Sequence, residues 1–238
     1  MRILGIESAS LTASVAVVTD DHLTAEYTIH HKKTHSQTLL PMIQEITVMT
    51  ELDLKSIDAI AVSAGPGSFT GLRIGSATAK GLALALKLPI ISVPTIDAMA
   101  YQCWRADCLI CPIMDARRGQ VYTGIYKFCN GEFMVCMEST AMEIERLMEI
   151  LNQKRGSVLF LGDGVPVYKE KIQQLASIKI EFAPAFMGRQ RAAAVAVLGM
   201  EYFKKGICEE ASVHTPVYLR QSSAERELAE KKEKEEQE

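Results

Sequence analysis

Long hydrophobic runs are missing from this chain of 238 residues. No stretch approaches the ~20 consecutive apolar residues that a membrane-spanning helix needs. The first residues, MRILGIESAS, reach Glu7 too early for a secretory signal sequence, so they predict a first β-strand. Without such a signal, the six cysteines indicate free thiols in a reducing compartment. We therefore expect a cytoplasmic protein with no membrane partner.

An excess of positive charge is also missing. The net charge is −3, and the imbalance lies in residues 224–238, which hold seven acidic and four basic residues. A protein that grips nucleic acid on its own usually has a basic face, because phosphate contacts supply most of its non-specific affinity. Composition predicts no such face here. The charged segment 221–238 offers little apolar surface to bury, so we expect disorder or a frayed helix there.

A complete phosphate-binding loop is absent as well. The loop GPGS at 65–68 precedes a predicted helix, which is the arrangement that binds anions through backbone N–H groups. No Gly-Lys-Ser/Thr follows, and Lys80 lies about three turns into the helix. The glycines therefore favour a tight turn stiffened by Pro66 over a phosphate cradle.

Metal and nucleophile signatures are weak. His31 and His35 have the i, i+4 spacing of a metal-binding pair, but they lie between a strand and a helix, so surface histidines are the simpler interpretation. Cys108 and Cys111 lack a second pair at zinc-finger spacing and are expected in the core. No Ser-His-Asp or Cys-His arrangement stands out, and we predict no catalytic or metal-binding residue.

What the chain does contain is an order of elements that occurs twice. The periodicity predicts strands near 3–6, 14–18, 23–29, 57–63 and 89–93 with helices from 36, over 70–86 and over 95–104, and then strands near 109–114, 120–128, 157–161 and 178–182 with helices near 144–151, 165–176 and 189–203. Each half opens with a hairpin whose first strand ends in a carboxylate, Glu7 or Asp115.

This repetition predicts an α/β protein of two duplicated subdomains with a cleft between them. We place the first subdomain at residues 1–105 and the second at 106–220. The last helix is expected to pack back on the first subdomain.

The predicted helix over 70–86 carries a stripe of small residues. Glycine inside a helix costs roughly 0.5–1 kcal/mol against alanine, so two glycines on one stripe indicate a very close neighbour. That neighbour is either the protein's own sheet or a helix of another subunit, and physics alone favours neither. The candidate interface residues are the stripe and its flanks: Gly71, Leu72, Arg73, Gly75, Ser76, Ala79 and Ala83.

The two hairpin turns hold the candidates for nucleotide or anion contact. Glu7, followed by Ser8, stands where a nucleotide cleft places a ligand for Mg²⁺-bound water, or it is a turn carboxylate. Arg117 and Arg118 in the second turn could bind anionic groups in a bidentate manner or pair with acidic residues across an interface.

Several segments taken together resemble the bacterial TsaB family, also called YeaZ, whose members are tRNA threonylcarbamoyladenosine biosynthesis proteins. The segments are ILGIES at 3–8, HSQ at 35–37, GPGSFTGLRIG at 65–75, AKGLA at 79–83, DARRGQVY at 115–122 and PVYLR at 216–220. The resemblance runs in order from residue 1 to about 220. It implies the actin/Hsp70/sugar-kinase-like (ASKHA) fold.

The resemblance also implies a partnership in place of catalysis by this chain. Family members pair with the paralogue TsaD, which transfers a threonylcarbamoyl group to the adenosine beside the tRNA anticodon, and an ATPase, TsaE, joins them. The chain is thus expected to be a non-catalytic, dimerising subunit that needs no cofactor of its own, with ATP and Mg²⁺ entering only in the complex and tRNA reached indirectly. The small-residue helix becomes the shared surface of homodimer and heterodimer, and Gly75→Leu is expected to break the dimer while the monomer stays folded.

Two departures from the relatives bear on chemistry. TsaD holds its metal with a His-x-x-x-His pair, and the corresponding positions here are Thr95 and Met99, which are poor ligands for a hard metal site. Glu7 stands where aspartate is usual. The competing hypothesis is an independent ATP-dependent phosphotransferase or ATPase, which the fold permits but which the missing glycine run in the second turn disfavours.

Overall fold

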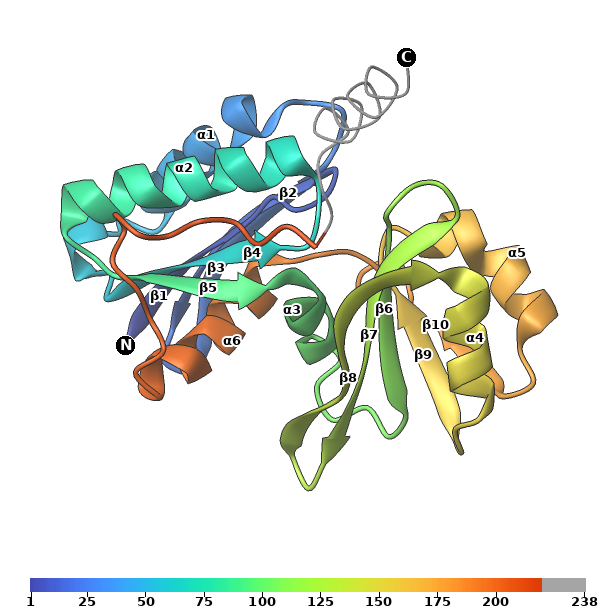
Figure 1. Cartoon of the computed structure of the whole chain (residues 1–238). Coiled ribbons are helices and arrows are strands. Elements are labelled where there is room, and N and C mark those ends of the chain that lie inside the picture. The colour runs from blue at the N-terminus through green and yellow to red at the C-terminus, as the bar shows by residue number, and fades with distance from the viewer. Residues whose placement is uncertain (220–238) are drawn as a thin grey trace, which may run out of the picture.

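The computed structural model describes residues 1–219, and the charged segment predicted at 221–238 lies outside the described residues. Two five-stranded sheets lie side by side, each with helices packed on it (Figure 1). Within residues 1–219 no helix combines the length and apolarity that crossing a membrane requires.

The first sheet has the order β3-β2-β1-β4-β5. Its strands are β1 (Arg2–Glu7), β2 (Thr12–Thr19), β3 (His22–His30), β4 (Ala59–Gly65) and β5 (Ile90–Pro94). Strand β1 pairs antiparallel with β2 and parallel with β4. The central strands are buried almost throughout, because helices α1 (His35–Met49) and α2 (Phe69–Leu86) cover one face and α6 (Ala192–Lys204) covers the other (Figure 1).

The second sheet has the order β10-β9-β6-β7-β8. Taken from the other edge, β8-β7-β6-β9-β10, it matches the order of the first sheet strand by strand. Its strands are β6 (Leu109–Asp115), β7 (Gln120–Cys129), β8 (Glu132–Glu143), β9 (Ser157–Leu161) and β10 (Lys179–Phe182), with helices α4 (Ile144–Asn152) and α5 (Val165–Leu175). Strand β6 again pairs antiparallel with its hairpin partner and parallel with β9. The predicted duplicated α/β architecture of the ASKHA type is confirmed.

Strand β8 was not predicted from the sequence. It is one of the two edge strands of the second sheet, and its residues are mostly exposed or half-buried. An edge strand with both faces partly in solvent does not show the alternation of apolar and polar residues on which strand prediction depends.

Helix α3 (Thr95–Tyr101) joins the two halves. It contacts β4 and β5 on one side and β6, β7 and β8 on the other. Ile96, Met99 and Ala100 enter one apolar cluster with residues of the second sheet. Beside them, the buried hydroxyl of Tyr126 donates a hydrogen bond of 2.7 Å to Asp97.

Candidate functional site

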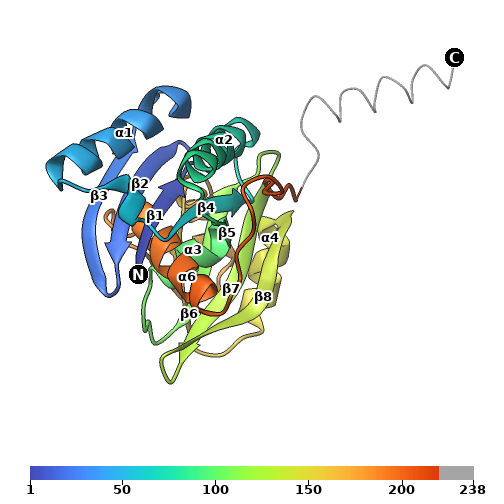
Figure 2. The ribbon, with the colours of Figure 1, turned by 90° about the vertical axis from the view of Figure 1, so that its left-hand side faces the viewer.

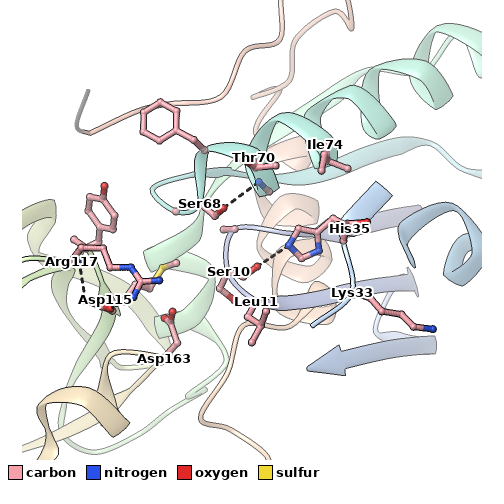
Figure 3. Close-up of a pocket in the computed structure, with 18 residues that line it drawn as sticks. Ser10, Leu11, Lys33, His35, Ser68, Thr70, Ile74, Asp115, Arg117 and Asp163 are labelled. Atoms are coloured by element: carbon pink, nitrogen blue, oxygen red, sulfur yellow. Dashed lines mark hydrogen bonds and ion pairs between the residues drawn. The ribbon is translucent and has the colours of Figure 1, made fainter. Parts of the chain in front are cut away.

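A cleft of about 700 Å³ lies between the halves (Figure 3). The first half contributes the β1–β2 turn and the N-terminal ends of α1 and α2, and the second half contributes the β6–β7 turn and the loop after β9. The carboxyl ends of the parallel strands in both sheets face this cleft, which is the usual location of a binding site in such sheets.

A chain of hydrogen bonds ties the two halves together across the cleft. Ser10 Oγ donates to Gln190 Oε1 at 3.0 Å, and Gln190 Nε2 donates to Asp163 Oδ1 at 3.3 Å. Burial raises the pKa of Asp163, and the hydrogen bond from Gln190 opposes that rise. The Ser10–Gln190–Asp163 link therefore restrains the two halves relative to each other at the cleft.

Glu7 lies beneath the cleft and does not line it. Its side chain is 1% exposed, and Oε1 accepts a hydrogen bond of 2.6 Å from the backbone N–H of Ala9. The pKa of Glu7 is raised to about 7: burial is the main cause and the nearby Asp163 adds to it, while hydrogen bonds from Ala9, Ser63 and Ser8 oppose the rise. The carboxylate therefore holds the turn together from inside the protein.

Ser8, the second predicted contact, is also fully buried. Its hydroxyl donates to the carbonyl oxygen of Gly71 at 2.9 Å, and its backbone N–H donates to Ser63 Oγ at 3.3 Å. Both side chains are engaged inside the fold, which favours the alternative interpretation of Glu7 as a turn carboxylate.

The second turn repeats the geometry of the first. Asp115 Oδ1 accepts the backbone N–H of Arg117 at 2.9 Å, two residues on, as Glu7 accepts that of Ala9. Arg117 and Arg118 are exposed and both have left-handed backbone conformations, with φ of 65° and 56°. Only Arg117 lines the cleft, and its guanidinium lies 3.4 Å from the Asp115 carboxylate, which offsets its charge.

The glycines of GPGSFTGLRIG allow close packing. A Cβ on Gly75 would lie well under 3.0 Å from Ser8 Oγ, and one on Gly65 would overlap the carbonyl oxygen of Val217. Gly67 and Gly71 are crowded in the same way by the carbonyl oxygens of the β1–β2 turn. The motif thus lets that turn and the C-terminal segment approach α2. This packing supports the interpretation of the loop as a tight turn and not as a phosphate cradle.

The predicted interface stripe faces the interior of its own chain. Of the seven candidate residues only Arg73 is exposed, and the other six are buried: Gly71, Leu72, Gly75, Ser76, Ala79 and Ala83. The first of the two open interpretations, packing on the protein's own sheet, accounts for these six. Gly75→Leu cannot leave the monomer unchanged, because the new side chain would collide with Ser8.

A second small-residue stripe lies on the opposite face of α2. Ala77, Gly81 and Ala85, at i, i+4 and i+8, are all exposed, and no atom of residues 1–219 lies within 4 Å of a Cβ built on Gly81. Leu84 on the same face is 61% exposed. Sequence reasoning missed this stripe because α2 carries small residues on two opposite faces, and periodicity does not tell which face meets the sheet.

His35 is buried, although the sequence predicted a surface histidine. It is the first residue of α1, with Nε2 2.8 Å from the carbonyl oxygen of Ser10. His31 is exposed. Within residues 1–219 no group of three metal-ligating side chains comes together. Thr95 and Met99, at the positions compared with the TsaD metal ligands, are both buried on α3.

Comparison with known proteins places this architecture. Residues 22–228 match the family described as TsaD, tRNA N6-adenosine threonylcarbamoyltransferase. The tRNA threonylcarbamoyladenosine biosynthesis protein TsaB of Bacillus subtilis is 35% identical over 94% of this chain and 96% of its own length. The TsaB protein of Escherichia coli is 36% identical over 69% of this chain and 72% of its own length.

A solved structure agrees with these relatives. YeaZ from Pseudomonas aeruginosa superposes with a TM-score of 0.78 at 26% identity and covers 92% of this chain and 99% of its own. The chain therefore belongs to the TsaB (YeaZ) family and takes part in the biosynthesis of threonylcarbamoyladenosine in tRNA.

Proposed function

We propose that this chain is a non-catalytic subunit that pairs with a catalytic TsaD-type paralogue in the transfer of threonylcarbamoyl to the adenosine beside the tRNA anticodon. A TsaE-type ATPase completes the complex, tRNA is contacted mainly through the paralogue, and the chain pairs with itself when the paralogue is absent. We place this work in the cytoplasm.

The observation that carries the proposal is the exposed face of α2. The stripe of alanine and glycine, which no part of the described chain covers, lets a second helix approach closely, and Leu84 provides apolar surface to bury there. Helix α1 lies beside α2 and exposes Leu40, Val48 and Met49, at 54%, 65% and 68%. Two adjacent helices with apolar exposed side chains form a surface suited to the helices of a partner.

The absence of catalysis in this chain is inferred from the cleft. The buried Glu7 is engaged by the turn, and the exposed Arg117 is offset by Asp115. Thr95 and Met99 pack in the interior at the positions compared with the metal ligands of TsaD. We propose that the chain needs no cofactor and that ATP and Mg²⁺ act only in the assembled complex.

Isothermal titration of the isolated chain with Mg-ATP is expected to show no binding, and tight binding with turnover would favour the phosphotransferase alternative.

The pairing surface is tested by Leu84→Asp. Placing a carboxylate where Leu84 would be buried is expected to weaken binding to a purified TsaD-type paralogue by roughly tenfold or more. Val167→Asp is the matched control, since Val167 is 59% exposed on α5 in the other half. Equal affinity of the Leu84 variant and the wild type, measured by calorimetry, would place the interface elsewhere.

A further inference from the structure

The segment 207–219, called here the C-terminal strap, runs along α2 on the side away from α1 (Figures 1 and 2). Its backbone is paired with the first sheet at both ends. Glu209 and Ile90 exchange two backbone hydrogen bonds, of 2.8 and 2.9 Å. The backbone N–H of Val217 donates to the carbonyl oxygen of Ala64 at 2.7 Å.

Buried polar groups fix the middle of the strap. His214 is 1% exposed, and its Nδ1 lies 2.8 Å from Glu209 Oε1 and 2.9 Å from Ser92 Oγ. Lys80 Nζ, from α2, donates to the carbonyl oxygens of His214 and Ser212 at 3.0 and 3.3 Å. The strap is thus attached to both β5 and α2.

An aromatic stack fixes the last residues of the strap. The ring of Tyr218 is stacked on that of Phe69 at a centroid distance of 4.3 Å, and Arg73 Nε donates to its hydroxyl at 3.2 Å. This end of the strap therefore lies at the first turn of α2, where the exposed face of that helix begins.

The strap holds apolar side chains in solvent although its backbone is fixed. Ala211 and His214 point inward and are buried, whereas Val213 and Val217 are 62% and 53% exposed. A hollow of about 440 Å³ lies between the C-terminal half of α2 and the strap, and Leu84 and Ala211 both line it. The exposed Leu84 of α2 and the first half of the strap therefore line the same hollow.

We propose that the C-terminal strap is part of the pairing surface and that Val213 and Val217 contact an apolar helical segment of the TsaD-type paralogue. This inference rests on the proposed function. Residues 220–238 of this chain do not suit the role of covering Val213 and Val217, because they contain only one leucine and two alanines among charged and polar residues. Exposed valines on an ordered segment, which begins beside the exposed Leu84 of α2, match the chemistry of a protein interface.

The test is the double variant Val213→Asp/Val217→Asp in the full chain, with calorimetric titration of the purified paralogue. We expect binding weakened by roughly tenfold or more, while Val167→Asp binds as the wild type does. Loss of binding in Leu84→Asp together with wild-type binding in the strap variant overturns the strap inference and leaves the proposed function standing. Wild-type binding in both variants overturns both.

A second measurement uses the unmodified proteins, so it does not depend on the folding of the strap variant. Hydrogen exchange of peptides from 207–219 is expected to slow when the paralogue is added. Unchanged exchange, with slowed exchange in α2, overturns the inference. Slowing in the homodimer alone also overturns it, because the occupant would then be a second copy of this chain.

Discussion

The hydroxyl of Ser8 donates to the carbonyl oxygen of Gly71 at 2.9 Å, and a Cβ on Gly75 would overlap that same hydroxyl. The β1–β2 turn thus lies directly on the first turns of α2. Because a side chain at Gly75 would push the turn away, this part of the GPGSFTGLRIG motif is required for packing within the monomer.

Two glycines of α2 therefore should respond in opposite ways to alanine. Gly75→Ala is expected to destabilise the protein by about 1–3 kcal/mol, because the added methyl collides with Ser8. Gly81→Ala is expected to stabilise it by about 0.5–1 kcal/mol, because the exposed position is open and alanine is the better helix former. Urea unfolding of both variants measures the difference, and equal effects would contradict the packing described here.

Glu7 predicts a pH dependence of stability. Its pKa is about 7 in the folded protein, above the ordinary glutamate value of about 4.5, so the unfolded chain loses this proton first as pH rises. Folding stability due to this group is highest below pH 4.5, falls between pH 4.5 and 7, and levels off above pH 7.

Glu7→Gln removes that titration while keeping an oxygen for the N–H of Ala9. The variant should therefore match the wild type near pH 4.5 and exceed its free energy of unfolding at pH 8, by about 3 kcal/mol at most. Unfolding titrations at the two pH values measure this. The same difference between variant and wild type at both values would show that the carboxyl is not buried as described.

Tyr126→Phe tests the link between the halves. Removing the hydroxyl leaves the buried Asp97 without its 2.7 Å donor, and we expect a loss of about 1–3 kcal/mol in the free energy of unfolding. The pKa of Asp97, already raised by burial, should rise further. Tyr202→Phe is the matched control, because the Tyr202 hydroxyl has no hydrogen bond within residues 1–219. Equal stability of the two variants would contradict the role given to Asp97.

Much of the fold could be predicted from periodicity, because the duplicated hairpin, strand and helix order leaves repeated apolar runs and two turn carboxylates. Strand β8 could not, because an edge strand lacks the required alternation. The residues of α2 could be placed on a helix but not oriented. Which small stripe meets the sheet depends on Ser8, a residue more than 60 positions away in sequence.

The candidate site shows the same limit. Sequence reasoning selected the two hairpin turns, and the structure places both at the cleft. It did not find the Ser10–Gln190–Asp163 link, since these residues are far apart in sequence and carry no motif. It also placed His35 at the surface, because the burial of a helix's first residue depends on the loop opposite it.

The most direct test of the central claim is threonylcarbamoyl transfer to tRNA by a purified TsaD-type paralogue with a TsaE-type ATPase and activated donor, with and without this chain. We expect transfer only when the chain is present, no transfer by the chain alone, and a reduced rate with Leu84→Asp but not with Val167→Asp. Full transfer without the chain would contradict its role as a required pairing subunit.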